Sequence, residues 1–340
     1  MSGFELCRRC TRFMSPAQSE ALLKLGHLLK EARYEFVTIT PASHERVLAR
    51  PALHDQKNAD LSLRQLLRDF FGWNKWVAKD LIPDEIGSLL EQANYLKADA
   101  EKIKSKVRVS TLESLIFFHS SFPTEEEYSV FFGPDSYRFV KFIEPHLERV
   151  KILADLGAGA GVGGIFAADL AGRNNFPLER VFLTDINAEA LSFSQLNHEL
   201  NGKGFCKTLE SDLFEALPEG IDAFIANPPF IIDQKGRLYR DGGTLKGGEF
   251  SLRIVKEFFS YALKTGRPTQ LLLYTGASWV DGKDLLRAEL ERFLQTQNMN
   301  SISYQYTEID PDIFGEQLEE PEYQDVERIA AVGIVIEVRD

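Results

Sequence analysis

Hydrophobic residues recur with the period of a helix along the first part of the chain. Ser15-Pro16 places an N-cap residue before a proline at the first helical position, and an amphipathic run follows. Helical periods cover residues 17–34, 62–81 and 83–103. Residues 106–121 instead indicate two short strands around a turn. Three helices followed by a hairpin are typical of a winged helix, and they fit equally a helical cap that packs on the rest of the chain.

From residue 150 onward, short apolar stretches rich in β-branched residues alternate with helical stretches. The predicted strands are residues 151–157, 181–186, 204–212, 221–228 and 269–276, and the helices between them include residues 188–201 and 250–266. This alternation indicates an α/β fold, with a parallel sheet and helices on both faces. After a helix at 283–297, two more strands at 301–310 and 329–339 are expected to complete a seven-stranded sheet.

The change of pattern divides the chain into two predicted domains. Its 340 residues exceed the usual size of one core, and Pro123-Thr124-Glu125-Glu126-Glu127 is typical of a linker. We therefore expect a mainly helical domain at 1–125 and an α/β domain at 126–340. A chain that is 44% hydrophobic and 26% charged is typical of a globular protein.

The expected location is the cytoplasm, without membrane contact. No apolar run reaches the roughly 18 residues of a membrane span, and the N-terminus lacks the apolar core of a signal peptide. Three cysteines are too few for a disulfide framework. Cys7 and Cys10 have the spacing of a redox or zinc pair, but no second pair stands at a matching distance, so no metal site is predicted.

Charge is distributed unevenly between the two predicted domains. Residues 1–125 carry 18 Lys and Arg against 16 Asp and Glu, a net charge of +2. Residues 126–340 carry 21 against 35, a net charge of −14. The second domain should repel a polyanion, so any contact with nucleic acid is expected in the first.

A glycine-rich loop follows the first strand of the α/β domain and precedes a helix. It comprises Asp155, Gly157, Ala158, Gly159 and Gly161. Glycines there let the backbone approach a bound nucleotide, and the helix N-terminus offers free N–H groups. Together with Gly164, the loop also satisfies the spacing of dinucleotide-binding enzymes, so by itself it leaves a nicotinamide-dependent oxidoreductase open.

Two acidic residues end the next two strands. Asp185, followed by Ile186, is placed to accept hydrogen bonds from both hydroxyls of a ribose. Asp212, followed by Leu213, can accept from an adenine amino group, and it can equally cap a helix.

The fourth strand ends on Asn227-Pro228-Pro229-Phe230, an abrupt stop for a buried strand. The Asn227 amide oxygen and the Pro228 carbonyl can both accept hydrogen bonds from one planar –NH₂ group. With both of its N–H groups held in this way, the nitrogen lone pair is directed at an electrophile. Phe230 can stack on the amide or nucleobase that carries the group. Two prolines hold the corner rigid, which suits a transition state that tolerates little misalignment.

With these residues the sequence resembles the Rossmann-like S-adenosylmethionine-dependent methyltransferases of the "small domain" group. This group includes the release-factor glutamine methyltransferases and the ribosomal RNA guanine-N2 methyltransferases. The resemblance covers about residues 130–340 and implies methyl transfer from S-adenosyl-L-methionine to an amide or exocyclic nitrogen. The implied catalytic residues are Asn227, Pro228, Pro229 and Phe230, and the implied cofactor-binding residues are Phe132, Asp155, Gly157, Ala158, Gly159, Gly161, Asp185, Ile186, Asp212, Leu213 and Asn227.

Two further segments bear on the substrate. Phe132 to Tyr137 resembles a segment that covers the cofactor in relatives, and residues 231–248 are long enough for a lid or substrate loop. The Pro-Arg-Pro signature of release-factor enzymes is missing before the core, which puts a glutamine acceptor in doubt.

The charge favours a macromolecular acceptor that is a protein or a ribonucleoprotein over naked nucleic acid. Methylation of a base in free RNA or DNA remains an alternative, as does a non-catalytic module that has kept the cofactor pocket. Affinity for naked RNA or DNA is expected to be negligible at physiological salt, with any residual binding carried by residues 1–125.

Overall fold

The structure is a computed structural model. It describes residues 13–50, 62–124, 126, 128–202, 206–233, 240–297 and 301–339. The predicted domain boundary between residues 125 and 126 therefore falls partly outside the described residues.

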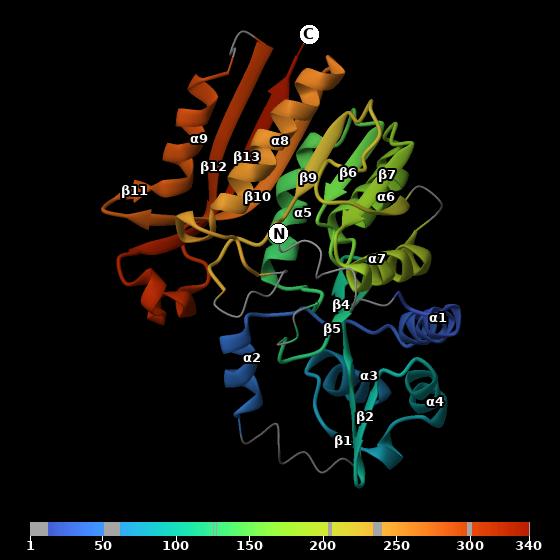
Figure 1. The fold of residues 1–340 in the computed structure, drawn as a ribbon. Helices are drawn as coiled ribbons and strands as arrows, with labels where there is room; N and C mark the ends of the chain where they lie inside the picture. Colours follow the sequence, from blue (N-terminus) through green and yellow to red (C-terminus); the bar gives the residue numbers. More distant parts are fainter. Residues whose placement is uncertain are drawn as a thin grey trace, which may run out of the picture.

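A mixed sheet of seven strands carries the second part of the chain, with the strand order β12-β13-β10-β9-β6-β7-β8 (Figure 1). Its strands are β6 (Ile152–Leu156), β7 (Arg180–Asp185), β8 (Cys206–Glu210), β9 (Ala223–Ala226), β10 (Thr269–Val280), β12 (Ile302–Asp310) and β13 (Arg328–Val338), and the short β11 (Lys283–Asp284) pairs with the end of β10. Strands β6 to β10 run parallel, whereas β13 is antiparallel to both β10 and β12. The predicted α/β fold and strand number are confirmed. The chain's last strand lies between β10 and β12, a position that the pattern did not predict.

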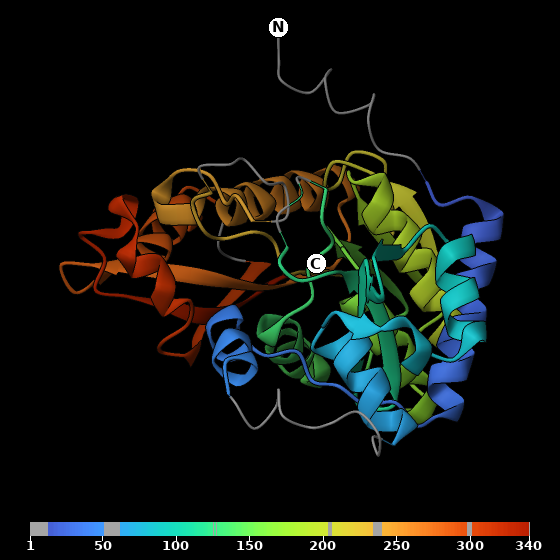
Figure 2. The same cartoon turned by 90° about the horizontal axis from the view of Figure 1, so that it is seen from below.

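Helices cover both faces of this sheet. Helices α5 (Pro134–Ile143), α6 (Val162–Asn174) and α7 (Ala188–Asn201) cover one face, and α8 (Glu249–Thr265) and α9 (Leu285–Gln295) cover the other. Figure 2 shows α8 in orange and α5 in green on opposite sides of the sheet. Because side chains alternate along a strand, Leu153 and Ala154 belong to different cores. Both faces of the strands are therefore buried, which explains why their sequences are almost continuously apolar.

The N-terminal part consists of helices and two small sheets. The helices are α1 (Pro16–Glu31), α2 (Pro41–Leu48), α3 (Leu63–Leu67), the π-helical η5 (Arg68–Gly72), the 3₁₀ helix η6 (Lys79–Leu81) and α4 (Asp84–Gln92). Strands β1 (Val77–Ala78), β2 (Leu96–Asp99) and β3 (Lys102–Ser105) form a sheet with β3 in the middle, and β4 (Val107–Leu112) and β5 (Leu115–Ser120) form a hairpin. In the C-terminal part, short 3₁₀ helices lie at η7 (Glu144–His146), η8 (Leu245–Gly247), η10 (Gly315–Glu319) and η11 (Pro321–Tyr323).

Two of the three predicted N-terminal helices were too long. The helical stretch from Leu63 ends at Gly72, and α4 ends at Gln92. Two residues beyond these ends, Asn74 and Asn94 have left-handed φ angles of 52° and 61°. Such angles stop a helix, and the remaining residues form the small sheet. The predicted hairpin is present, but it pairs only with itself and packs on α7. The part is therefore a set of helices with small sheets and not clearly a winged helix, which was one of the two arrangements that the pattern fitted equally.

Side chains of α7 complete the open edge of the β4–β5 hairpin. The amide of Asn201 bonds the backbone of Ile116, and the amide of Asn197 bonds both the N–H and the carbonyl of Phe118, at 2.8 and 2.9 Å. Asparagines four residues apart on one helix thus replace a neighbouring strand. Asn197 also donates to the carbonyl of Ala160 at 3.0 Å, which links the hairpin to the glycine-rich loop.

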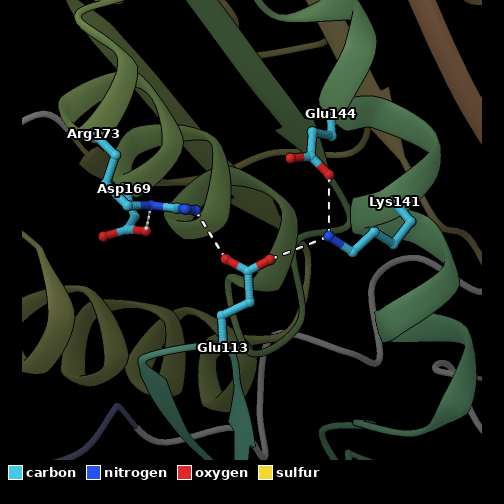
Figure 3. A network of polar contacts seen from close by, with 5 residues as sticks. All are labelled: Glu113, Lys141, Glu144, Asp169 and Arg173. Atoms are coloured by element: carbon cyan, nitrogen blue, oxygen red, sulfur yellow. Dashed lines mark hydrogen bonds and ion pairs between the residues drawn. The ribbon is translucent and has the colours of Figure 1, made fainter.

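A network of ion pairs joins the tip of the hairpin to the α/β part (Figure 3). Glu113 accepts from Lys141 of α5 at 3.1 Å and from Arg173 of α6 at 2.9 Å. Lys141 also pairs with Glu144, and Arg173 with Asp169. The hairpin is therefore held at its edge by amides and at its tip by charges.

None of the helices in the described ranges is long and apolar enough to cross a bilayer.

Candidate active site

The carboxyl ends of neighbouring strands bring the main predicted residues together. Strand β6 ends in register with β7 on one side and with β9 on the other. Gly157, Asp185 and Asn227 therefore lie side by side along one edge of the sheet, with Gly157 in the middle. Neighbouring strands lie about 4.8 Å apart, so Asp185 and Asn227 stand about 10 Å apart. The strand order reverses between β6 and β9, which is where open α/β sheets bind their ligands.

The loop after β6 leaves open space at two of its glycines. Gly157 and Gly159 have left-handed φ angles of 66° and 56°, and a Cβ at either would meet no atom within 4 Å. Gly161 also has a left-handed φ, of 80°, but a Cβ there would lie 2.8 Å from Ile165 Cδ1, so the space beside this glycine is filled. The N–H of Ala158 donates to the carbonyl of Thr184 at 2.8 Å and holds the loop against β7. The loop thus has room for a ligand beside its first two glycines.

Asp185 fixes this loop from β7. Its Oδ2 accepts from the N–H of Gly159 at 3.0 Å, and its Oδ1 accepts from the N–H of Asn187 at 2.9 Å. Burial raises the pKa of Asp185, and these backbone N–H groups oppose the rise. Ile186 follows with 38% of its surface exposed, which leaves an apolar surface beside the loop.

Asp155 lies within β6 and is directed at α6. Its Oδ2 accepts from the N–H of Gly164 at 2.8 Å. Burial raises the pKa of Asp155 to about 7, the Gly164 N–H opposes the rise, and the charge of Asp185 adds to it. A Cβ at Gly164 would lie 2.3 Å from Leu183 Cδ2, so glycine lets α6 approach the sheet closely. Asp155 ties α6 to the sheet.

Asp212 lies two residues beyond the end of β8. Its Oδ2 pairs with Arg253 of α8 at 2.9 Å. Leu213, the next residue, is buried with a left-handed φ of 48°. The side chain of Asp212 thus anchors its loop to α8, and its contact with an adenine remains a prediction.

A pocket with about 430 Å³ of space between atoms, part of it open to solvent, lies beyond β9. Its lining combines three aromatic rings, a carboxylate, an amide and a guanidinium, from Phe131, Asp135, Asn227, Pro228, Pro229, Phe230, Ile231, Arg240 and Phe314. All four residues of the Asn-Pro-Pro-Phe corner are included. Among the described residues none forms a hydrogen bond with the amide of Asn227, so both its oxygen and its NH₂ group are available to a ligand.

Phe230 is held in place by its neighbours. Its ring lies edge-to-face against Phe314, with the ring centroids 5.4 Å apart. A Cβ at Gly276 of β10 would lie 2.3 Å from Phe230 Cδ2, so the ring packs directly on the backbone of β10. The ring is therefore a fixed wall of the pocket.

Asp135 lines the pocket and lies in the segment from Phe132 to Tyr137 that was expected to cover the cofactor, although it was not among the predicted site residues. It stands at the start of α5, buried, and its Oδ1 accepts from the Tyr274 hydroxyl at 2.6 Å and from Arg138 at 3.4 Å. Burial raises the pKa of Asp135, and its bonds with Tyr274 and Arg138 oppose the rise. The signal for Asp135 was the resemblance of this segment, which did not show which of its side chains would reach the pocket.

Phe132 is not among the residues that line this pocket, and its contact with the cofactor remains a prediction. Phe132 is buried away from the pocket, with its ring stacked on His119 at a centroid distance of 5.1 Å, whereas Phe131 lines the pocket.

In the predicted lid, Ile231 and Arg240 line the pocket. Residues 234–239 of this lid, like Cys7 and Cys10, lie outside the described residues. Within the described ranges, no three His, Cys, Asp or Glu side chains group as metal ligands.

Comparison with known proteins identifies the segment that carries this site. Residues 137–240 match the family model described as "Methyltransferase small domain". The chain is 34% identical over 112 residues to ribosomal RNA small subunit methyltransferase C of Ectopseudomonas mendocina, a match that spans 28% of this chain and 30% of that protein. It is 39% identical over 89 residues to the protein of the same name from Actinobacillus succinogenes, over 25% and 24% of the two chains.

Among solved structures, the fold is similar to Trm5b from Pyrococcus abyssi. The identity is 15%, the TM-score is 0.46, and the match covers 83% of this chain and 80% of that one. The family match lies within the predicted α/β domain, and over residues 137–240 it agrees with the resemblance to the small-domain methyltransferases. The chain matches less than a third of the length of the curated relatives.

Proposed function

We propose that the protein transfers a methyl group from S-adenosyl-L-methionine to an exocyclic amino nitrogen of a nucleobase in RNA, free or within a ribonucleoprotein. The observation that supports this most is the pocket at β9. It places the amide of Asn227, which bonds none of the described residues, among three aromatic rings and next to a glycine loop with room for a ligand. The curated relatives are named as ribosomal RNA methyltransferases, which favours RNA over the protein acceptor that the charge suggested.

The residues around the glycine loop fit the cofactor. Gly157 and Gly159 leave open space, Asp185 offers carboxylate oxygens at the end of β7, and Ile186 offers an exposed apolar side chain. In this proposal Asp185 holds the ribose while it keeps its bond with the Gly159 N–H, because each carboxylate oxygen can accept more than one hydrogen bond. Asp212 and Leu213 border the adenine. When bound, S-adenosylmethionine supplies a methyl group on a positively charged sulfur.

The Asn-Pro-Pro-Phe corner orients the acceptor nitrogen. The Asn227 oxygen and the Pro228 carbonyl would each accept a hydrogen bond from one of its two N–H groups, which leaves its lone pair free to attack the methyl group. As the new N–C bond forms the S–C bond breaks, and the surplus proton on nitrogen leaves to solvent. Phe230 and Phe131 provide flat apolar walls for a nucleobase. Preorganised contacts of this kind are a main source of rate acceleration.

Asp135 is a positioning residue in this proposal. Tyr274 and Arg138 hold its carboxylate at the rim of the same pocket as Asn227. A carboxylate there can accept from a ring N–H next to the exocyclic amino group, or from the cofactor's ammonium group.

The test combines binding and transfer. Calorimetry with S-adenosylmethionine and with NADH should show binding of the first only. In a second assay, the protein transfers tritiated methyl groups to macromolecules in a cell lysate. RNase, and not protease, should then release the tritium label from the macromolecular fraction. Label that only protease releases would favour a protein amide, which the −14 charge of residues 126–340 supports as a second candidate. Binding of NADH alone would overturn the methyltransferase proposal.

A further inference from the structure

The small sheet β1–β3–β2 has one buried face and one exposed face. Val77 and Ile103 point to the buried face. Because side chains alternate along a strand, Lys102 and Lys104 of β3 lie on the other face, as does Trp76 just before β1.

Strand β2 adds a further lysine to this exposed face. Lys97 lies directly opposite Lys104, and Asp99 lies opposite Lys102. Like charges that face each other across two strands destabilise a sheet. Lysines on an edge strand can prevent aggregation, which would explain Lys97 on β2. Lys102 and Lys104 stand on the central strand, so that explanation does not cover them.

The positive charge of this face is compensated only in part, by Asp99 opposite Lys102. Lys97 and Lys102 are exposed, and neither has a hydrogen bond or ion pair with any residue in the described ranges. Lys104 donates to the backbone carbonyl of Phe122 at 2.9 Å. Behind it, the buried Arg108 donates to the carbonyl of Gly72, and none of the described carboxylates pairs with it. The pKa of Lys104 is lowered, first by burial and then by the charges of Lys97 and Arg108.

Trp76 places a flat aromatic surface beside these lysines. It is 44% exposed, and no described ring stacks on it. Bases of single-stranded nucleic acid stack on such side chains while lysines contact the phosphates. The neighbouring helix α4 is a poorer surface for a polyanion, because its exposed side chains include Asp84, Glu85 and Glu91.

We propose that this face, formed by Trp76, Lys97, Lys102 and Lys104, binds a single-stranded segment of the RNA substrate outside the active site. The inference rests on the proposed function, since it concerns the same substrate. It replaces the charge-based expectation of negligible affinity for naked RNA and keeps the expectation that residues 1–125 carry the binding. It also gives the N-terminal part a role that the acidic α/β part cannot fill, because a net charge of −14 repels phosphates.

The test is fluorescence anisotropy of the full chain with a fluorescein-labelled single-stranded RNA of about 12 nucleotides, at about 50 mM and about 200 mM salt. Trp76→Ala should weaken binding roughly 5- to 150-fold, which is the usual stacking free energy of one base expressed as affinity. The double variant Lys97→Gln, Lys102→Gln should lower the log–log salt slope by about 1.4, since each phosphate that a lysine no longer neutralises accounts for about 0.7.

Matched controls come from the far end of α8. Leu263 is 78% exposed, and Lys264 is exposed with only a 3.8 Å ion pair to Glu219, so Leu263→Ala and Lys264→Gln should leave RNA binding unchanged. Variants of the sheet face that bind like these controls would overturn the inference. The inference would also be overturned if poly-glutamate bound as tightly as the RNA and if Trp76→Ala left that binding unchanged. Such a result would indicate a protein partner.

Failure of this inference can be separated from failure of the proposed function. Each variant is also titrated with S-adenosylhomocysteine by calorimetry, and its thermal unfolding is recorded. Intact cofactor binding without RNA binding overturns the inference alone, whereas absent cofactor binding in the wild type overturns the proposed function.

Discussion

Asn227 combines an amide without a described hydrogen bond with a rigid diproline corner. If it orients the acceptor nitrogen, Asn227→Ala should lower kcat by about 10²- to 10³-fold while affinity for the cofactor stays near that of the wild type. Steady-state kinetics and calorimetry measure the two quantities. A parallel loss of both would make Asn227 structural, and no loss of either would remove it from catalysis.

Asp185 is expected to act on the cofactor and on the loop. Asp185→Ala should weaken binding of S-adenosylhomocysteine at least tenfold, because it removes one or two charge-assisted hydrogen bonds of about 1.5–3 kcal/mol each. Asp185→Asn keeps an acceptor for the Gly159 N–H but removes the charge, so it should lie between alanine and wild type. Unchanged affinity in the alanine variant would exclude Asp185 from the cofactor site.

Asp155 makes a prediction about pH. Its pKa is about 7 in the folded protein against 3.8 for the free group. Its contribution to stability is fully present below about pH 4 and is lost as the pH rises to about 7, because only the unfolded chain releases the proton readily in this window. Asp155→Asn lacks this titration and can still accept from the Gly164 N–H.

The stability of Asp155→Asn relative to wild type should therefore rise between about pH 4 and pH 7 and stay constant above that range. Urea unfolding at several pH values measures the difference. A difference independent of pH would mean that Asp155 titrates in the folded protein as it does in water.

At the scale of elements, helix α7 joins the two parts of the molecule. Asn197→Ala should leave the backbone groups of Phe118 and the carbonyl of Ala160 without partners inside the protein. Each unpaired buried group costs about 1–3 kcal/mol, so the free energy of unfolding should fall by about 3 kcal/mol or more. Urea denaturation measures it, and Glu199→Ala on the exposed side of α7 is the control. A loss no larger than that of the control would show that the hairpin edge is held by other contacts.

At the scale of the whole molecule, the charged network of Figure 3 should matter less than these amides. Its side chains are between 23% and 63% exposed, and exposed ion pairs contribute about 0–1 kcal/mol each. Glu113→Gln should therefore lower the free energy of unfolding by about 1 kcal/mol or less, with a smaller effect at high salt. Thermal unfolding at two salt concentrations tests this, and a loss as large as that of Asn197→Ala would contradict it.

Local pattern was sufficient for the strands of the seven-stranded sheet and for α7, α8 and α9, but not for α5 or for the position of β13 in the sheet. The period of two or 3.6 residues follows from which side of an element is buried, so strands such as β6 and helices such as α7 could be predicted. The glycine loop and the Asn-Pro-Pro-Phe corner were also predictable, because backbone freedom and backbone rigidity are properties of single residue types. The parallel strands then brought Gly157, Asp185 and Asn227 to one edge, as expected.

Contacts between distant segments were decided by the tertiary structure alone. Asp135 meets Tyr274 because α5 packs against β10, Phe314 reaches Phe230 from the far end of the chain, and Asn197 pairs with β5 only once α7 lies beside it. Helical period also failed at Asn74 and Asn94, where left-handed turns and strand pairing outweigh local preference. Sequence determines the conformation that each segment favours. Which segments meet depends on how their buried faces pack, and here that packing adds Asp135 and two further aromatic rings to the predicted site.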